Sequence, residues 1–389
     1  MQWAGKRGRA ATREGLRQVR RRRNQERFGQ PMHILRRERL GAQVDQMMKR
    51  EIIGLVVVSL TLMLMLTPKA SAQDKQSETD ARPRPSRLIH TFSIVARDAV
   101  TGEIGVAVQS HWFSVGAIVP WAEAGVGAVA TQSFVDPSYG KLGLDLMRMG
   151  KTAPEALKSL LAGDEGRDVR QVAMIDAKGN VDAWTGKNDI QAAGHIVGRN
   201  YSVQANLMAN DKVWPAMSRA FETTKGDLAD RMLAALDAAQ SVGGDIRGKQ
   251  SAALIVVTGK PTGKPWADRV FDLRVDDHAE PLKELRRLVT LQRAYNHMNA
   301  GDLAVEKKDN EGALREYSAA EKLVPDNAEM IYWHAVALVN MKRVEEALPL
   351  FRRVFAMDKN WAELTPRLPK SGLLPDDAKL IERILRESR

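Results

Sequence analysis

The chain has 389 residues, of which 44% are hydrophobic, enough for the cores of about two domains. Its net charge of +11 is concentrated near the N-terminus, where residues 1–46 carry thirteen Lys or Arg against four Asp or Glu. Beyond residue 72 the 43 basic and 43 acidic residues balance, which excludes nucleic acid as a partner of the body of the chain, because a phosphate backbone requires a concentrated excess of Lys and Arg. Cysteine is absent from the sequence, so disulfides and thiolate metal sites are excluded.

Residues 47–72, MMKREIIGLVVVSLTLMLMLTPKASA, have the pattern of a signal peptide. Lys49 and Arg50 form a positive start, an apolar run follows, and Ala70-Ser71-Ala72 has the form of a cleavage site. The apolar run of about 15 residues is shorter than the roughly 20 that span a bilayer. We therefore expect export to the periplasm or the exterior, with cleavage before Gln73 and membrane contact only during export.

Residues 1–46 are predicted to be a basic leader that precedes the true start of the protein, at Met47 or Met48, because a signal peptide begins a few residues before its apolar segment. A long positive region of the signal and an RNA-binding arm are the alternatives. Residues 73–88 are polar and contain two prolines, which predicts a disordered linker.

Residues 89–275 mix strand and helix patterns and predict an α+β domain. The strands expected from alternating or continuous apolar positions are 91–97, 103–110, 124–134, a hairpin over 170–186, 201–208 and 251–257. The helices expected from their periodicity are 139–149, 153–161, 213–223 and 229–239. Strands followed by helices and again by strands indicate sheets packed face to face with helices outside.

Residues 280–389 contain a self-similarity with a period of 34 residues. Small, small, aromatic and apolar residues recur at the same offsets, in the pairs Gly301/Ala335, Ala313/Ala347, Tyr317/Phe351 and Ala320/Val354. This pattern is typical of tetratricopeptide repeats and predicts an all-α helical repeat domain. Helices over 281–299 and 376–387 are expected to cap the repeats or to dock them on the first domain. Two uses of this domain remain open, namely a groove for a protein or peptide partner and a surface for capping or dimerisation, which would make the protein a homo-oligomer.

Several blocks of the first domain resemble a known family. TFSIVARD, TGEIGVAVQS, VPWAEAGVGAVATQSF, PSYGKLGLDLM, RQVAMIDAKG, YSVQANLM and GGDIRGKQSAALIVV together resemble the bacterial and archaeal family known as domain of unknown function 1028, over about residues 91–257. That family is similar to the N-terminal nucleophile (Ntn) hydrolases. The resemblance therefore implies a four-layer αββα sandwich, and it implies no substrate.

Thr91 aligns with the nucleophile of the Ntn hydrolases. In those enzymes a Thr, Ser or Cys that begins the first strand attacks an amide carbonyl, and its own α-amino group acts as the base. Signal cleavage leaves Gln73 as the N-terminus, so catalysis requires a second cleavage between His90 and Thr91. Proteasome-like members also place a Lys near the nucleophile, whereas this chain has no Lys between Thr91 and Lys141, and Arg97 cannot serve as a base because it stays protonated. The alternative, which we favour on the residues alone, is a β-branched residue that begins a strand.

Other polar side chains stand at strand ends. The amides of Gln132 and Asn206 could donate to an oxyanion, or they could satisfy buried backbone groups, the role that we favour slightly. Asp245 and Arg247 are expected to form a structural ion pair. The histidines lack the spacing of metal ligands and the glycine-rich segments lack that of a P-loop, so we expect neither a metal nor a cofactor.

Three functional hypotheses follow from these patterns. The first is an exported amidohydrolase or peptidase of the Ntn type that acts on an amide or peptide of the envelope. The second is a non-catalytic binding module on the same fold, in which the repeats recruit a partner protein. The third is an assembly or scaffold role carried by the repeats.

Overall fold

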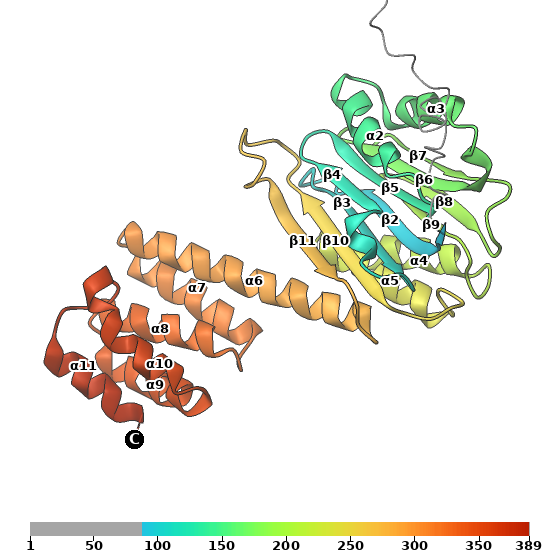
Figure 1. Cartoon of the computed structure of the whole chain (residues 1–389). Helices are drawn as coiled ribbons and strands as arrows, with labels where there is room; N and C mark the ends of the chain where they lie inside the picture. The colour runs from blue at the N-terminus through green and yellow to red at the C-terminus, as the bar shows by residue number, and fades with distance from the viewer. Residues whose placement is uncertain (1–87, 389) are drawn as a thin grey trace, which may run out of the picture. The chain divides into compact units, whose positions relative to one another are not determined.

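The computed structural model describes residues 88–388. The predicted basic leader over 1–46, the signal peptide over 47–72 and nearly all of the predicted linker over 73–88 lie outside the described residues. The described part of the chain is an α+β region with two antiparallel sheets, followed by a region of paired helices (Figure 1). No helix within residues 88–388 combines the length and the apolar composition needed to cross a membrane.

The strands form two sheets in which each pair is antiparallel. The first sheet has the order β1 (Leu88–Ile89), β5 (Gly127–Phe134), β6 (Arg170–Asp176) and β7 (Val181–Thr185), with β4 (Pro120–Glu123) also paired to β5. The second sheet has the order β11 (Arg269–Val275), β10 (Ser251–Val257), β3 (Ile104–Ser110), β2 (Thr91–Arg97), β9 (Tyr201–Ala205) and β8 (Gly194–Gly198). The chain passes from the first sheet to the second at His90, between β1 and β2.

The facing surfaces of the two sheets enclose one apolar core. Val95, Val106 and Val108 of the second sheet pack there with Ala128, Ala130, Ala173 and Ile175 of the first. The many alanines allow the two backbones to approach closely. Successive side chains of a strand point to opposite faces, so Phe92 and Ile94 lie on the other face of β2, in a second core.

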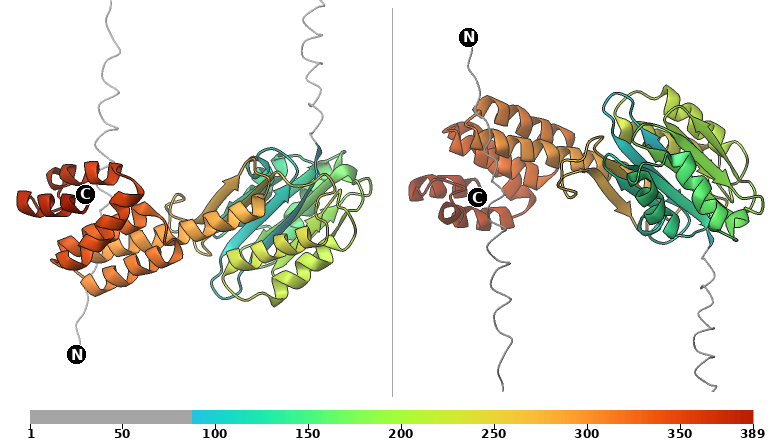
Figure 2. Two further views of the ribbon diagram at one scale, coloured as in Figure 1. Left: turned by 90° about the horizontal axis from the view of Figure 1, so that it is seen from below. Right: turned by 90° about the horizontal axis from the view of Figure 1, so that it is seen from above.

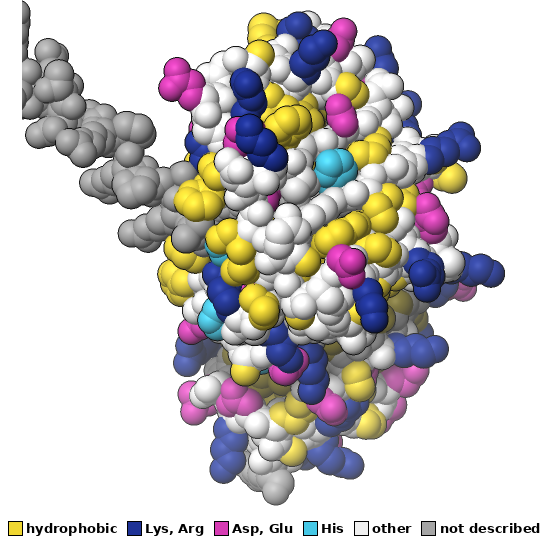
Figure 3. Space-filling view, turned by 90° about the vertical axis from the view of Figure 1, so that its right-hand side faces the viewer, with side chains coloured by type: hydrophobic (Ala, Val, Ile, Leu, Met, Phe, Trp, Pro, Cys, Tyr) yellow, Lys and Arg dark blue, Asp and Glu magenta, His cyan; other side chains and the backbone are white. Residues whose placement is uncertain are grey.

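Helices cover the outer face of each sheet (Figures 1 and 2). On the first sheet, α2 (Ser138–Arg148) and α3 (Ala153–Gly163) pack on Val129 and Met174. On the second sheet, α4 (Val213–Thr223) and α5 (Leu228–Ser241) pack on Phe92 and Ile94. The start of α3 is fixed by a capping box, in which Thr152 and Glu155 satisfy each other's backbone N–H groups. On the face shown in Figure 3, basic and acidic side chains are interspersed.

The C-terminal region consists of helices that pack as successive pairs. Its elements are α6 (Pro281–Glu306), α7 (Asn310–Leu323), α8 (Ala328–Asn340), α9 (Val344–Met357), α10 (Asn360–Leu364) and α11 (Ala378–Leu385). The first turns of α6 bury Leu285 and Val289 in the core of the second sheet, and the remainder of α6 packs on α7. At the crossing of α6 with α7, a Cβ on Gly301 would stand 2.7 Å from the ring of Tyr317, so this contact requires glycine.

Short 3₁₀ turns complete the fold, at Val115–Ala117, Arg167–Val169, Thr365–Arg367, Pro369–Ser371 and Arg386–Ser388. The strands predicted over 91–97 and 251–257 and the helix predicted over 213–223 match to the residue. The single strand predicted over 124–134 is in fact the turn after β4 followed by β5, with Gly125 at φ 69° in the turn. Strands β1, β4, β8 and β11 were not predicted, and Leu88 of β1 is the last residue of the segment predicted to be a disordered linker.

Candidate functional site

The fold brings Thr91, Gln132 and Asn206 together between the two sheets. Thr91 begins β2, Gln132 lies near the end of β5, and Asn206 directly follows β9. The Thr91 carbonyl oxygen accepts hydrogen bonds from Gln132 Nε2 at 3.2 Å and from the Asn206 backbone N–H at 3.1 Å. All three residues are 0% exposed. Because Val95 faces the space between the sheets, the pleat of β2 places Thr91 and Ser93 on the same face.

Gln171, at the start of β6, connects these residues across the two sheets. Its Oε1 accepts from Gln132 Nε2 at 2.6 Å and from Asn206 Nδ2 at 2.9 Å, while its Nε2 donates to the carbonyl of Ala205 at 2.9 Å. Ser93 Oγ donates to Gln132 Oε1 at 2.6 Å. We call Ser93, Gln132, Gln171 and Asn206 the amide network. The sequence pattern did not single out Gln171, which completes it.

The peptide bond that precedes Thr91 is held by two donors. The carbonyl oxygen of His90 accepts from Ser110 Oγ at 2.5 Å and from Arg247 Nη2 at 2.8 Å. The same Nη2 also donates to Asp245 Oδ2 at 2.6 Å. The predicted ion pair is therefore present, and its guanidinium group in addition contacts the carbonyl next to the candidate nucleophile. A cation so placed withdraws electron density from that carbonyl.

The His90 side chain belongs to the same cluster. Its Nδ1 lies 2.9 Å from Asn206 Oδ1. Asn206 donates through Nδ2 to Gln171, so its Oδ1 is the acceptor and His90 Nδ1 carries the proton. Burial lowers the pKa of His90, which keeps the ring neutral at physiological pH.

The residues before Thr91 take part in the fold. Ile89 pairs with Ser133 and Leu88 with Phe134, so β1 adds a strand to the first sheet, and His90 is 3% exposed. The intact chain therefore continues away from Thr91 through a paired strand. Cleavage after His90 would end the chain at the start of β2 and separate β1 from it.

Ser133, the residue after Gln132, holds a buried carboxylate. Its backbone φ of 70° lies in the left-handed region, which is unusual for a residue other than glycine. Ser133 Oγ donates to Asp189 Oδ1 at 2.7 Å, and within residues 88–388 Asp189 Oδ2 has no hydrogen-bond partner. Burial raises the pKa of Asp189 to about 6, and the hydrogen bond from Ser133 offsets part of this effect. Sequence reasoning did not find this pair.

The described residues offer no group of three or more His, Asp or Glu side chains that could hold a metal ion. His195 is connected to the amide network through Thr185, whose Oγ1 lies 2.8 Å from His195 Nδ1 and accepts from Gln171 Nε2 at 2.8 Å. Burial lowers the pKa of His195. What the site presents is a hydroxyl residue, fixed amides and a polarised peptide carbonyl. These are groups for acyl transfer.

Comparison with known proteins matches this chain to a family and to four solved chains. Residues 91–285 match the family of unknown function DUF1028. The crystal structure of protein SPO2555 from Silicibacter pomeroyi, described with the same family, is 31% identical; the match covers 55% of this chain and 88% of that chain, with a TM-score of 0.48. No curated protein matches significantly. The family match begins at Thr91, after β1 and His90, covers the rest of the two-sheet region and ends early in α6.

Proposed function

We propose, from the premise that this chain belongs to the family of unknown function DUF1028, that it is an exported amide hydrolase of the Ntn type with Thr91 as its nucleophile. The fold in this proposal is the four-layer αββα sandwich of those enzymes. It is supported by two antiparallel sheets that face each other across an apolar core and carry helices on their outer faces. Export rests on the signal-like sequence of residues 47–72.

The observation that carries the proposal is the pair of donors on the His90 carbonyl oxygen, Ser110 Oγ and Arg247 Nη2. Negative charge develops on this oxygen when the Thr91 hydroxyl adds to the carbonyl carbon, and fixed donors stabilise that charge. The bond between His90 and the Thr91 nitrogen then breaks, the nitrogen takes up the hydroxyl proton, and His90 is left as an ester on Thr91 Oγ. Water hydrolyses the ester, which yields a carboxylate on His90 and a free amine on Thr91.

The freed amine has the chemistry of a general base. An ordinary α-amino pKa lies near 8, so a useful fraction is neutral at physiological pH. Removal of His90 leaves Ser110 and Arg247 without the carbonyl that they held. In this proposal the carbonyl of an amide or peptide substrate takes that place. Gln132 Nε2 and the Asn206 backbone N–H orient Thr91 through its carbonyl oxygen. The side-chain amides of Gln132 and Asn206 donate to the oxyanion by exchanging their bonds to Gln171 Oε1.

The N-terminus of the protein purified from cells tests this proposal. Intact-mass spectrometry of the wild type is expected to give a chain that begins at Thr91. Thr91→Val keeps the β-branched shape and removes the hydroxyl, so this variant should retain the preceding residues. Thr223→Val, at an exposed position on α4, serves as the matched control and should be processed like the wild type. A wild-type chain that begins at Gln73 would contradict the hydrolase proposal.

A non-catalytic ligand- or protein-binding module is the second candidate. It is favoured by the complete burial of Thr91, Gln132 and Asn206 and by the saturated hydrogen bonds of the amide network. In both candidates we propose that the helical region is tetratricopeptide-like and binds a protein or peptide partner. All eight residues of the 34-residue pattern are buried at the contacts between helices, which supports that identification.

A further inference from the structure

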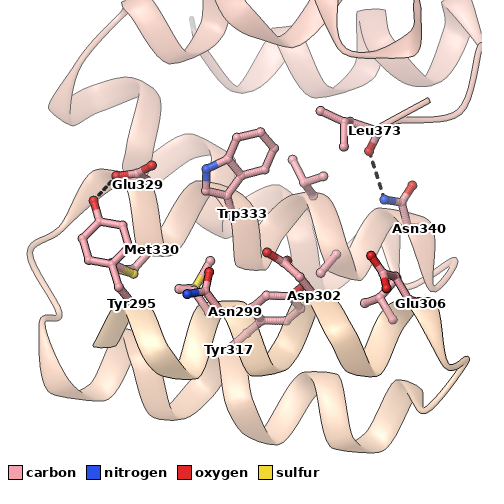
Figure 4. Close-up of a pocket in the computed structure, with 14 residues that line it drawn as sticks. Tyr295, Asn299, Asp302, Glu306, Tyr317, Glu329, Met330, Trp333, Asn340 and Leu373 are labelled. Atoms are coloured by element: carbon pink, nitrogen blue, oxygen red, sulfur yellow. Dashed lines mark hydrogen bonds between the residues drawn. The ribbon is translucent and has the colours of Figure 1, made fainter. Parts of the chain in front are cut away.

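The helical region contains a cavity of about 480 Å³ between α6 and α8. Figure 4 shows side chains of both helices pointing into it. On α6 these are Tyr295, Asn299, Asp302 and Glu306, which share one helix face. The residues 34 positions later on α8 are Glu329, Trp333, Val336 and Asn340, and they line the opposite side. The repeat thus places equivalent positions of two successive units around one cavity, which Tyr317 of α7 also lines.

The charge of this cavity has one sign. Asp302, Glu306 and Glu329 line it, and no Lys or Arg is among its lining residues. Tyr317 Oη donates to Asp302 Oδ1 at 2.7 Å, and Tyr295 Oη donates to Glu329. Two of the carboxylates are therefore fixed in orientation by neutral donors. The hydrogen bond to Glu329 raises the pKa of Tyr295 to about 12, so this hydroxyl keeps its proton at neutral pH.

Apolar surface lies between the carboxylates. Trp333 occupies the middle of the cavity in Figure 4, with Met330 and Tyr295 on one side and Glu306 on the other. The face of a Trp ring attracts cations, and methionine adapts to partners of different shape. An apolar stem with a cationic end matches this combination, and Lys and Arg side chains have that form. The cavity volume falls in the range of sites that hold a small ligand or a few residues of a peptide.

We propose that this cavity binds a peptide segment of a partner protein that carries Lys or Arg. The cationic ends pair with Asp302, Glu306 and Glu329, and the stems lie on Trp333. The inference specifies the chemistry of the partner proposed above for the helical region, and it is independent of amide hydrolysis in the two-sheet region.

Fluorescence anisotropy with the purified full-length protein tests the inference. The probes are short fluorescein-labelled peptides that alternate Ala with Lys, with Gln or with Glu. The Lys peptide is expected to bind, and its affinity is expected to fall as the salt concentration is raised. A double variant with Asp302→Asn and Glu306→Gln should bind the Lys peptide about tenfold more weakly, since each substitution removes one charge without changing the shape of the side chain. Glu363→Gln, at an exposed position outside the cavity, should leave affinity within about twofold of the wild type.

Each other outcome overturns the inference. Equal binding of the Gln peptide shows apolar docking without charge selection, and equal weakening by Glu363→Gln shows non-specific attraction. Preference for the Gln or Glu peptide leaves a peptide-binding role in place and refutes the cationic partner. A dimer in light scattering that Glu306→Gln dissociates assigns the cavity to a second copy of the chain. Thermal unfolding of each variant checks that it is folded. If Asp302→Asn destabilises the protein, the affinity of the single variant Glu306→Gln for the Lys peptide serves as the test.

Discussion

Replacing Asp189 with Asn should make the protein more stable at neutral pH and change how its stability depends on pH. Asp189 is 4% exposed, and within residues 88–388 its Oδ2 has no hydrogen-bond partner. Burial raises its pKa from an ordinary value of 3.8 to about 6. Between these two values the folded protein binds a proton that the unfolded chain has released. The contribution of Asp189 to the free energy of unfolding is therefore fully present below about pH 4 and is lost as the pH rises through 6.

The shift sets the size of the effect. One pKa unit corresponds to about 1.4 kcal/mol, so the wild type loses up to about 3 kcal/mol of unfolding free energy between about pH 4 and pH 7.5. Asp189→Asn preserves the shape, can still accept from Ser133, and has no charge to bury. The new N–H group at the position of Oδ2 costs about 1 kcal/mol at every pH. The quantity to measure is therefore how the difference in unfolding free energy between Asp189→Asn and the wild type depends on pH.

Urea unfolding of both proteins at a series of pH values measures this difference. The stability of Asp189→Asn relative to the wild type should rise by about 2–3 kcal/mol from about pH 4 to pH 7.5. Asp211→Asn, at an exposed carboxylate, should give a difference that is nearly flat across the same range. A flat difference for Asp189→Asn as well would refute the reasoning, because it would mean that the folded protein does not hold a buried charge at this position.

Two further substitutions test the packing and the ion pair. Arg247→Met leaves the carboxylate of Asp245, whose side chain is 0% exposed, without its cation. We expect urea unfolding to show a loss of about 3 kcal/mol in unfolding free energy, and mass spectrometry to show no cleavage before Thr91. An unchanged stability would rule out the structural role of the ion pair. Gly301→Ala places a Cβ 2.7 Å from the ring of Tyr317 and should cost about 1–3 kcal/mol in the same assay. Gly163→Ala, where the new Cβ meets no atom within 4 Å, is its control and should be neutral or stabilising.

Strands with a continuous or strictly alternating apolar pattern were predictable from the sequence. The buried strand β10, SAALIVV, has apolar side chains facing both cores, so its pattern alone defines it. Strands β8 and β11 lie at the two edges of the second sheet. β8 is short and begins and ends with glycine, and β11 carries three charged residues. Neither strand therefore has an apolar pattern that distinguishes it from a loop.

The candidate site was predictable in its first members. Gln132 and Asn206 are polar residues within or next to apolar strands, which is a signal that the sequence carries. Gln171 has the same property, but it follows Arg170 at the start of its strand, where polar residues are common. Asp189 lies in an irregular segment between β7 and β8. Its burial is set by tertiary structure, so no local pattern distinguishes it from an exposed aspartate.

The amide network also determines how the two sheets are aligned. Ala128, Ala130 and Ala173 give the first sheet a shallow inner surface, and such a surface by itself would resist sliding only weakly. The bonds from Gln132 to the Thr91 carbonyl and from Gln171 to the Ala205 carbonyl join fixed positions on opposite sheets. A displacement by one residue would strand these amides in a dry interior, at a cost of about 1–3 kcal/mol for each lost partner. The hydrogen bonds of these polar groups therefore favour a single alignment of one sheet against the other.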